Sequence, residues 1–389
     1  IDTRAPNRYQ GGVLLERWCA SHCMSHEGLK ARVPAALKRH ALGLALGFAL
    51  AAAIANPALA AAAKSKHPGR HDVRVTVERM RILMGTPCTI VAEGLDSVWT
   101  AASIDSALHL IAALDGVLSL WKDGGELSAL DSAEAEVRTQ VSPSLYAVID
   151  SALAIAAETD GAFDPTVEPL TRVWDLRGEG RVPAPEQIAD ARQSVGWAMV
   201  QIEPTIRTVR FRREHMGLDL DGIAKGYALD VAIAFLRTRR LSRVLIDFGS
   251  DFECFSDGEA WTLDVGDPDD RNAPVVRLVT RSGGVSISGQ SARFLTKNGG
   301  HFDRVLDPRS GRPLDLRASV TVVARTGTRS DALATAFLVM GRERIPEFLA
   351  SHRDLGVMWL EREGHSLKGW RWNLPTASIA PNVKLDWVQ

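Results

Sequence analysis

The stretch Leu218-Asp-Leu-Asp-Gly-Ile-Ala-Lys-Gly-Tyr-Ala-Leu-Asp230 places three carboxylates, a lysine and two glycines where an extended segment turns into a helix. Further along the chain, Ser330-Asp-Ala-Leu-Ala-Thr335 puts a carboxylate and a hydroxyl four positions apart, so both project from one helix face. Hard oxygen ligands beside a glycine-containing helix start suit a divalent cation that binds a phosphate. The two stretches therefore predict a magnesium-dependent site for a phosphorylated ligand.

Both stretches also have a purely structural interpretation. Asp331 and Thr335 would then be a carboxylate near a helix N-terminus and an ordinary surface threonine. The residues around them are small or apolar, which predicts a buried helix, and a buried carboxylate needs a partner such as a metal ion. Lys225 next to Gly226 suits a cation held close to a phosphate, or a lysine in solvent beside a packing glycine. The remaining acids of the first stretch are either ligands or capping and solvent-facing groups: Asp219, Asp221 and Asp230.

Composition and charge indicate a soluble globular protein. The chain has 389 residues, of which 46% are hydrophobic and 24% are charged, with a net charge of -1 and a pI near 6.9. This length is enough for one large domain. A nucleic-acid partner would show as a basic stripe, and the sequence has none, so no nucleic-acid partner is expected.

Residues 1–60 have the order of a secretory leader. Lys38-Arg39-His40 precede an apolar run, 41–55, and Ala58-Leu59-Ala60 offers small residues at a cleavage position. Met24 is the expected start of translation, with an upstream extension before it. The interpretation is an exported, periplasmic protein whose folded part is 61–389, with a leader retained as an anchor in the inner membrane as the alternative.

The cysteines leave one question open. Cys19 and Cys23 would be removed with the leader, so their spacing is not interpreted as a metal site. Cys88 and Cys254 could pair in an oxidising compartment, but two buried thiols is the interpretation that we favour.

The hydrophobic pattern predicts a mixed α/β (α+β) fold with mixed sheets and packed helices, because several consecutive strands have no helix between them. There is no Walker loop and no Gly-x-Gly-x-x-Gly after a strand, so neither a P-loop nor a Rossmann fold is expected. The predicted strands are Val73–Val77, Thr89–Ala92, Thr205–Arg212, Val244–Phe248, Trp261–Val265, Val275–Val279, Gly284–Ser288, Ser319–Ala324 and Val357–Leu360. The predicted helices are Ala102–Val117, one that starts at Ser142-Pro143 and ends before Gly161, Gly222–Leu236, Ser330–Met340 and Glu343–Ala350, and 177–185 is predicted as a surface loop.

Three further segments are compatible with a ligand site. Gly161-Ala-Phe-Asp-Pro-Thr166 places an aromatic ring and a carboxylate in a turn. Trp121 is either a core residue or a ring that stacks on a ligand. Val305-Leu-Asp-Pro-Arg-Ser-Gly311 is another Asp-Pro turn, from which Arg309 could reach a phosphate.

In this order, Met84-Gly-Thr86, the 161–166 turn, the 218–230 stretch, Leu306-Asp-Pro-Arg-Ser-Gly311 and Asp331-Ala-Leu-Ala-Thr335 resemble the motifs of the ApbE family, the FAD:protein FMN transferases. The resemblance covers the chain from about Val73 to about Leu360. It implies that 61–389 is an ApbE-like flavin transferase domain.

The resemblance implies a substrate, a cofactor and a set of site residues. The family binds FAD and Mg²⁺ and moves FMN onto a Thr or Ser hydroxyl of an exported target protein, some of these targets being associated with the inner membrane, and AMP is released. The metal ligands fall on Asp331, Thr335 and the backbone carbonyl of Gly222. The flavin-contacting positions fall on Met84, Trp121, Ala162, Phe163, Asp164, Asp219, Lys225 and Val305.

The chain departs from the family pattern at a position that matters for chemistry. Family members usually have a histidine, implicated in transfer, where this chain has Arg304. A guanidinium cannot accept a proton near neutral pH, so the expected roles are a phosphate contact for Arg304 and proton transfer through Asp307 or the metal-bound hydroxyl. Gly125 and Ser250 also replace a family serine and a family glycine. The alternatives to transfer are an FAD pyrophosphatase and a non-catalytic periplasmic FAD-binding protein.

Overall fold

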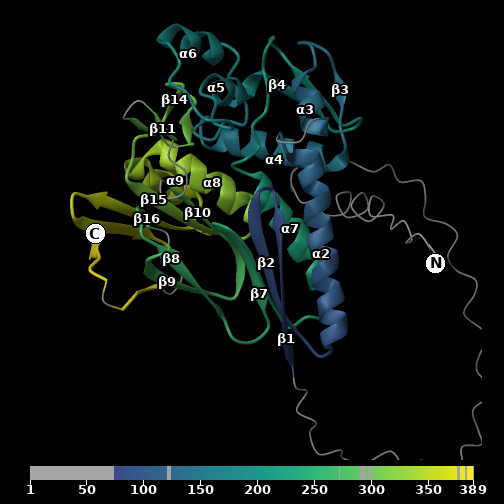
Figure 1. Ribbon diagram of the computed structural model, residues 1–389, viewed down its shortest axis with the longest axis vertical. Coiled ribbons are helices and arrows are strands. Elements are labelled where there is room, and N and C mark those ends of the chain that lie inside the picture. Colours follow the sequence, from purple (N-terminus) through teal and green to yellow (C-terminus); the bar gives the residue numbers. More distant parts are fainter. Residues whose placement is uncertain are drawn as a thin grey trace, which may run out of the picture.

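The computed structural model describes residues 74–120, 124–270, 272–289, 295–297, 300–302, 304–374, 377–381 and 383–388, with 295–297 and 300–302 described as backbone only. The predicted leader, 1–60, and Trp121 lie outside these described residues. The described part forms a large sheet with helices on one face and a smaller sheet on the other (Figure 1).

The large sheet has nine strands and is antiparallel except for its last pair. The antiparallel pairing of its other neighbouring strands confirms the mixed fold and excludes a doubly wound parallel sheet. In sheet order the strands are β1 (Val75–Leu83), β2 (Thr86–Gly94), β6 (Arg243–Phe248), β7 (Asp251–Ser256), β10 (Ser282–Gly289), β15 (Ala318–Ala324), β16 (Gly356–Glu363), β17 (Ser366–Trp372) and β19 (Asp386–Trp387).

A tight hairpin joins β1 and β2. Met84 and Gly85 both have positive φ values, 46° and 67°, as a two-residue turn between paired strands requires. The predicted strands here are confirmed and are longer than predicted, since the register runs from Val75 opposite Gly94 to Leu83 opposite Thr86. The turn carries Met84 to the rim of the cavity described below.

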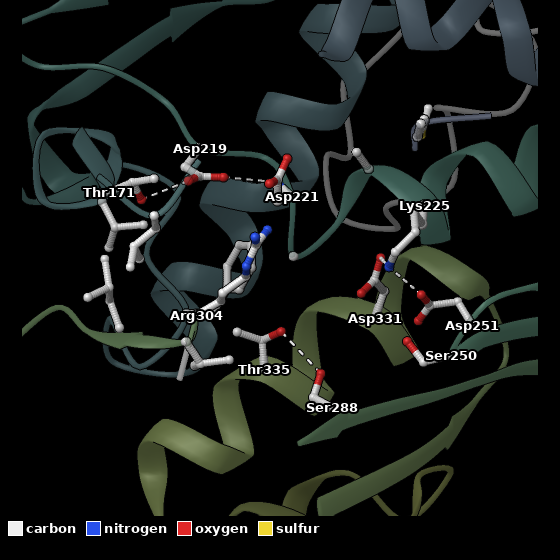
Figure 2. Close-up of a pocket in the computed structure, with 18 of the residues that line it drawn as sticks. Thr171, Asp219, Asp221, Lys225, Ser250, Asp251, Ser288, Arg304, Asp331 and Thr335 are labelled. Carbon is white, nitrogen blue, oxygen red and sulfur yellow. Dashed lines mark hydrogen bonds and ion pairs between the residues drawn. The ribbon is translucent and has the colours of Figure 1, made fainter. Parts of the chain in front are cut away.

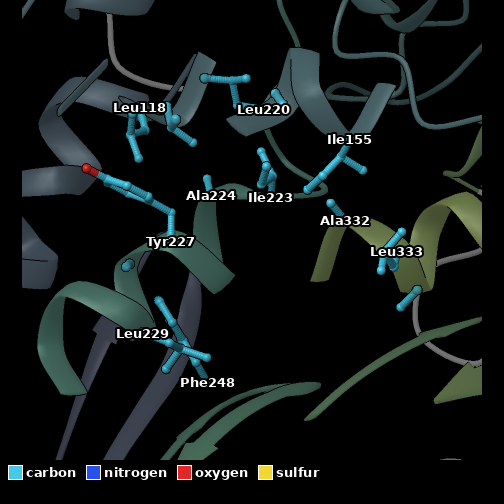
Figure 3. Close-up of a cluster of buried hydrophobic side chains, with 14 of the residues drawn as sticks. Leu118, Ile155, Leu220, Ile223, Ala224, Tyr227, Leu229, Phe248, Ala332 and Leu333 are labelled. Atoms are coloured by element: carbon cyan, nitrogen blue, oxygen red, sulfur yellow. The ribbon is translucent and has the colours of Figure 1, made fainter. Parts of the chain in front are cut away.

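Four helices form the main core with this sheet (Figures 1 and 3); three of them pack directly on one of its faces, and the fourth packs against those helices. Asp96 and Ser142 accept hydrogen bonds from Trp99 N and Leu145 N and so cap two of these helices, the second of which was predicted from Ser142-Pro143. Figure 3 shows side chains from several of these helices and from β6 meeting in one apolar cluster. The helices are α2 (Ser97–Leu118), α4 (Pro143–Glu158), α7 (Ala224–Arg237) and α8 (Gly327–Met340).

A three-stranded sheet packs through a second apolar cluster against the other face. Its strands are β18 (Ala377–Ile379), β9 (Pro274–Thr280) and β8 (Trp261–Gly266). The remaining strands form three small sheets: β3 (Thr139–Gln140), β5 (Thr208–Phe211) and β4 (Val200–Glu203); β11 (Leu295–Lys297) and β12 (Gly300–Phe302); β13 (Leu306–Asp307) and β14 (Arg312–Pro313). The shorter helices are α3 (Glu126–Asp131), α5 (Glu168–Val173), α6 (Pro185–Arg192) and α9 (Ile345–Ser351), with 3₁₀ turns at Trp197–Met199 and Arg342–Arg344.

The two cysteines in the described part of the chain form no disulfide bond. Cys88 and Cys254 are free and buried, which confirms the interpretation as two thiols, and burial raises the pKa of each to about 12.

Within the described chain, one helix, α2, is long and apolar enough to cross a membrane. Its buried side chains, among them Ile104, Leu108 and Ile111, belong to the main core, as in the core helix of a globular domain.

Candidate active site

A cavity of about 670 Å³ brings together segments that are far apart in the sequence. Its walls come from the β1–β2 turn, the C-terminal end of α2, the 162–177 region, the N-terminal part of α7, the adjoining ends of β7 and β10, the segment leading into β13, and α8. Both stretches that were predicted to bind a cation and a phosphate line this cavity (Figure 2).

The three predicted metal ligands converge in this cavity. Asp331 lies near the start of α8, and Thr335 follows one turn later on the same face. Gly222 lies directly opposite, since a Cβ on it would be 3.3 Å from Thr335 Oγ1. Asp331 Oδ2 also accepts a hydrogen bond of 2.9 Å from Gly226 N, which ties the start of α7 to α8.

Lys225 lies between two buried carboxylates. Its Nζ pairs with Asp251 Oδ2 and lies 3.8 Å from Asp331 Oδ2. Burial raises the pKa of Asp331 to about 7, helped by the nearby Asp251 charge and opposed by Lys225. Burial alone would lower the pKa of Lys225, but Asp251 and Asp331 outweigh it and raise this pKa above its ordinary value. Two carboxylates thus share one ammonium group, which leaves an excess negative charge at this wall when Asp331 is ionised.

The residues present fit a magnesium ion. The donors are a carboxylate, a hydroxyl and a backbone carbonyl, and all are hard oxygens. The described residues contain no group of three or more His, Cys, Asp or Glu side chains placed to hold a metal. A cation here would therefore complete its coordination with water and with phosphate oxygens of a ligand, as Mg²⁺ usually does. The excess negative charge beside Asp331 favours a cation at the same place.

The opposite wall is organised around Asp219. Asp219 Oδ2 accepts hydrogen bonds from Thr171 Oγ1 at 2.8 Å and from Arg177 Nη2 at 2.7 Å. Its backbone N donates to Pro165 O at 2.7 Å, which ties the 218–230 stretch to the 161–166 turn. Arg177 also lies 3.6 Å from the buried Glu168. The carboxylate of Asp219 is thus fixed by partners in the wall.

Asp221 and Arg304 occupy the space between these walls (Figure 2). The Asp221 side chain is exposed to the cavity, yet the surrounding protein desolvates it. This desolvation and the neighbouring Asp219 raise the pKa of Asp221 to about 6, while Arg177, Lys225 and Arg304 oppose the rise.

The other described positions of the predicted flavin site also line the cavity. They are Met84, Ala162, Phe163, Asp164 and Val305. One oxygen of Asp164 accepts hydrogen bonds from Thr166 within the turn, and the other accepts from Trp197 N in the 3₁₀ turn 197–199. Asp164 therefore shapes the wall, whereas the others offer apolar surface.

Comparison with known proteins places this geometry in a family. The model of the ApbE family matches residues 84–359, which is most of the chain. The chain belongs to the ApbE family. Among its curated relatives, the FAD:protein FMN transferase of Salmonella typhimurium is 28% identical over 297 residues, covering 74% of this chain and 85% of that protein. The enzyme of the same name from Escherichia coli K12 is 27% identical, covering 77% of this chain and 88% of that protein.

Solved ApbE structures have the same fold. The ApbE protein of Thermotoga maritima superposes with a TM-score of 0.68 at 26% identity, covering 75% of this chain and 96% of that one. The flavinyl transferase ApbE of Pseudomonas stutzeri superposes with a TM-score of 0.66 at 23% identity, covering 76% of this chain and 94% of that one, a likeness that concerns the fold alone.

In this ApbE chain Asp307 does not line the cavity. Its carboxylate accepts hydrogen bonds from Arg309 N and Nε at 2.9 Å each, and Arg309 Nη2 donates to Val339 O at 2.8 Å. Through these bonds the pair fixes the β13–β14 hairpin on α8, so the Asp307 carboxylate supports the hairpin. Arg309, considered above as a phosphate contact, is committed to the same hairpin.

Sequence reasoning missed several residues that line the cavity of this ApbE chain. Asp251 starts β7, a strand that the hydrophobic pattern did not predict. Arg177 was assigned to a surface loop, yet it lines the cavity and holds Asp219. Thr171 and Ser288 are uncharged and had no distinctive spacing. The two aromatic residues of the 251–256 segment, Phe252 and Phe255, were the one available signal for β7, since aromatic residues favour strands.

Proposed function

We propose that this chain is a Mg²⁺-dependent FAD:protein FMN transferase, which moves FMN from FAD to a Thr or Ser hydroxyl of an exported target protein and releases AMP. The observation that carries the proposal is the convergence of Gly222, Asp331 and Thr335 on one cavity. Membership of the ApbE family and relatives named FAD:protein FMN transferase support the transferase class.

The reaction exchanges the phosphoanhydride bond of FAD for a phosphoester bond to the target. The target hydroxyl oxygen forms a bond to the flavin-side phosphorus of FAD, and the bond from that phosphorus to the oxygen of the AMP phosphate breaks. The hydroxyl gives up its proton, and AMP leaves with the bonding electron pair. Bound Mg²⁺ supplies polarisation of the diphosphate and neutralises charge that develops on it.

The residues of the chain bind and orient the reactants. Asp331, Thr335 and the Gly222 carbonyl would hold the metal, and Lys225 keeps the Asp331 carboxylate in place through its charge. The apolar surfaces of Met84 and Phe163 are suited to the flavin ring system. Fixed dipoles and charges of this kind stabilise a transition state without further reorganisation.

The cellular setting belongs to the same proposal. The leader-like pattern in 1–60 supports export to the periplasm, with retention as an inner-membrane anchor as the alternative. The target would then be an exported protein, either free or associated with the inner membrane, and the process would be protein flavinylation.

Arg304 supports two alternatives that the experiment must separate from transfer. Because arginine does not accept a proton at neutral pH, the chain lacks an obvious base for the hydroxyl at that position. An FAD pyrophosphatase would use water in place of the hydroxyl and release FMN and AMP. A non-catalytic periplasmic FAD-binding protein would hold intact FAD.

The test is incubation of the purified chain with FAD, Mg²⁺ and an exported domain that carries a flavinylation threonine. Intact-mass measurement of the target and chromatography of the nucleotides are the readouts. We expect a target heavier by one FMN less one water and an equal amount of AMP, both abolished by EDTA. FMN and AMP with an unmodified target would establish hydrolysis, and intact FAD with an unmodified target would leave only binding.

A further inference from the structure

Arg304 enters the cavity from a backbone segment that is held in place by hydrogen bonds. The residue lies just before β13, which pairs with β14, and Leu314 N donates to Val305 O at 2.9 Å immediately beside it. Trp174 Nε1 holds the same hairpin by donating to Gly311 O at 2.8 Å. The backbone that follows Arg304 is therefore fixed, which limits the positions its guanidinium can take.

The cavity walls would repel an anionic ligand unless cations offset them. Carboxylates of both walls face or border the space: Asp219, Asp221, Asp251 and Asp331. Two cationic side chains are engaged within the walls themselves. Arg177 Nη2 lies 2.7 Å from Asp219, and Lys225 pairs with Asp251 and lies 3.8 Å from Asp331.

Arg304 differs from these two cations in its location. Figure 2 shows its side chain extending between Asp221 on one side and Thr335 on the other, so that it borders the proposed cation position. A diphosphate bound to a cation at Asp331 and Thr335 would project its remaining oxygens into this space. A guanidinium is planar and permanently charged, and it binds phosphate oxygens through two parallel N–H groups.

We propose that Arg304 binds non-bridging oxygens of the dinucleotide's diphosphate and, together with the cation held by Asp331 and Thr335, positions it for reaction. The identity of the ligand as FAD rests on the proposed function. Arg304 is then an electrostatic contact and takes no part in proton transfer. A ligand with more phosphate groups should therefore lose more affinity when Arg304 is replaced.

The test compares variants and ligands in equilibrium binding. Flavin fluorescence would give the Kd of FAD, FMN and riboflavin, with Mg²⁺ present, for the unmodified chain and for Arg304→Gln, Arg304→Lys and Arg312→Gln. Arg312 is the matched control, because it lies on the same hairpin, is exposed and does not line the cavity. Thermal unfolding of each variant checks that the fold is intact.

We expect Arg304→Gln to weaken FAD about 10- to 100-fold, the value of one lost charge-assisted contact, and to leave riboflavin within about two-fold. The Kd of Arg304→Lys for FAD should lie between those of the unmodified chain and Arg304→Gln, since lysine keeps the charge and loses the paired N–H groups. The Kd values of Arg312→Gln for all three ligands should match those of the unmodified chain. If Arg304→Gln folds and weakens all three ligands equally, or none, the assignment is wrong.

The binding experiment separates this inference from the proposed function. If the unmodified chain binds FAD but transfers no FMN, the phosphate-dependent difference among the variants still supports Arg304 as the diphosphate contact. If the unmodified chain transfers FMN and Arg304→Gln binds FAD as tightly, the function stands and this inference fails. A chain that binds no FAD with Mg²⁺ would overturn both.

Discussion

The backbones of Gly226 and Gly327 touch where α7 crosses α8. A Cβ on Gly226 would lie 2.2 Å from the carbonyl oxygen of Gly327, and a Cβ on Gly327 would lie 2.7 Å from that of Gly226. The same crossing brings Gly226 N to 2.9 Å from Asp331 Oδ2. The two glycines therefore set the position of Asp331 in the cavity as well as the packing of the helices.

Gly226→Ala should destabilise the fold and weaken the site together. The added methyl meets backbone, which cannot rotate away, so the helices must separate at a cost of about 1–3 kcal/mol or more in the free energy of unfolding. Urea unfolding would measure this cost, and Mg²⁺-dependent FAD binding should fall in parallel. Gly116→Ala is the matched control, because Gly116 also lies in a helix and a methyl added to it would have no atom within 4 Å, so it should gain about 0.5–1 kcal/mol. An unchanged free energy for Gly226→Ala would contradict this account of the crossing.

Asp230 should stabilise the fold because it holds the first residues of α8. It accepts hydrogen bonds from Gly327 N at 2.7 Å, from Thr328 N at 3.0 Å and from the Thr328 hydroxyl. Burial and the neighbouring Asp230 raise the pKa of Glu253 well above its ordinary value. Asp230→Ala should cost about 1–3 kcal/mol at pH 7 because it leaves buried amides unpaired. Glu253→Gln should cost much less, since the amide keeps the shape of the buried side chain and places no charge beside Asp230; equal losses in urea unfolding would contradict this account.

The hydrophobic pattern and the motifs predicted much of this arrangement. Val244–Phe248 and Ser319–Ala324 are regular apolar strands, and the structure has them as β6 and β15. Asp331 and Thr335 were placed on one helix face from their spacing alone, because the helical period determines it.

What the pattern could not predict depends on contacts between distant segments. β7 carries Asp251 and Glu253, and both are buried, although acids normally indicate exposed positions. Their burial depends on Lys225 and on Asp230, which belong to α7. Arg177 lies in a stretch rich in Gly and charge, which is typical of a surface loop, and only the tertiary pairing with Asp219 brings it to the cavity.

The pH dependence of stability should contain a contribution from Asp131. Asp131 Oδ1 accepts from Leu218 N at 2.9 Å, while its Oδ2 is buried without a hydrogen-bond partner in the described part of the chain. A Cβ on Gly217 would lie 3.2 Å from this Oδ2 and 2.9 Å from Glu168 Oε2, so the two carboxyls flank one residue. Burial, with a smaller contribution from Glu168, raises the pKa of Asp131 from 3.8 to about 8. The folded state holds this proton more tightly than the unfolded state. The contribution of Asp131 to the free energy of unfolding is therefore fully present below about pH 4 and is lost as pH rises through about 8.

Asp131→Asn should remove that contribution. The asparagine oxygen can still accept from Leu218 N, and its amide can donate toward Glu168, so the packing is preserved. Unfolding measured at pH 5, 7 and 9 should show the variant and the unmodified chain diverging as pH rises, with the variant the more stable at pH 9. Other buried acids contribute to both proteins and cancel in the comparison. A constant difference across the three pH values would show that Asp131 does not titrate as the structure implies.

The hydroxyl of Thr335 should be needed for the cation and not for the fold. Thr335→Val keeps the shape of the side chain and removes the oxygen that lies opposite Gly222, whereas Thr335→Ser keeps the oxygen and loses a methyl. Loss of one ligand to a charged group corresponds to about a ten-fold or larger rise in the Mg²⁺ concentration for half-maximal FAD binding. Thr335→Ser should stay within about three-fold of the unmodified chain, and both variants should unfold at similar urea concentrations. A Mg²⁺ titration of flavin fluorescence measures the difference, and a valine variant with unchanged Mg²⁺ dependence would remove Thr335 from the metal site.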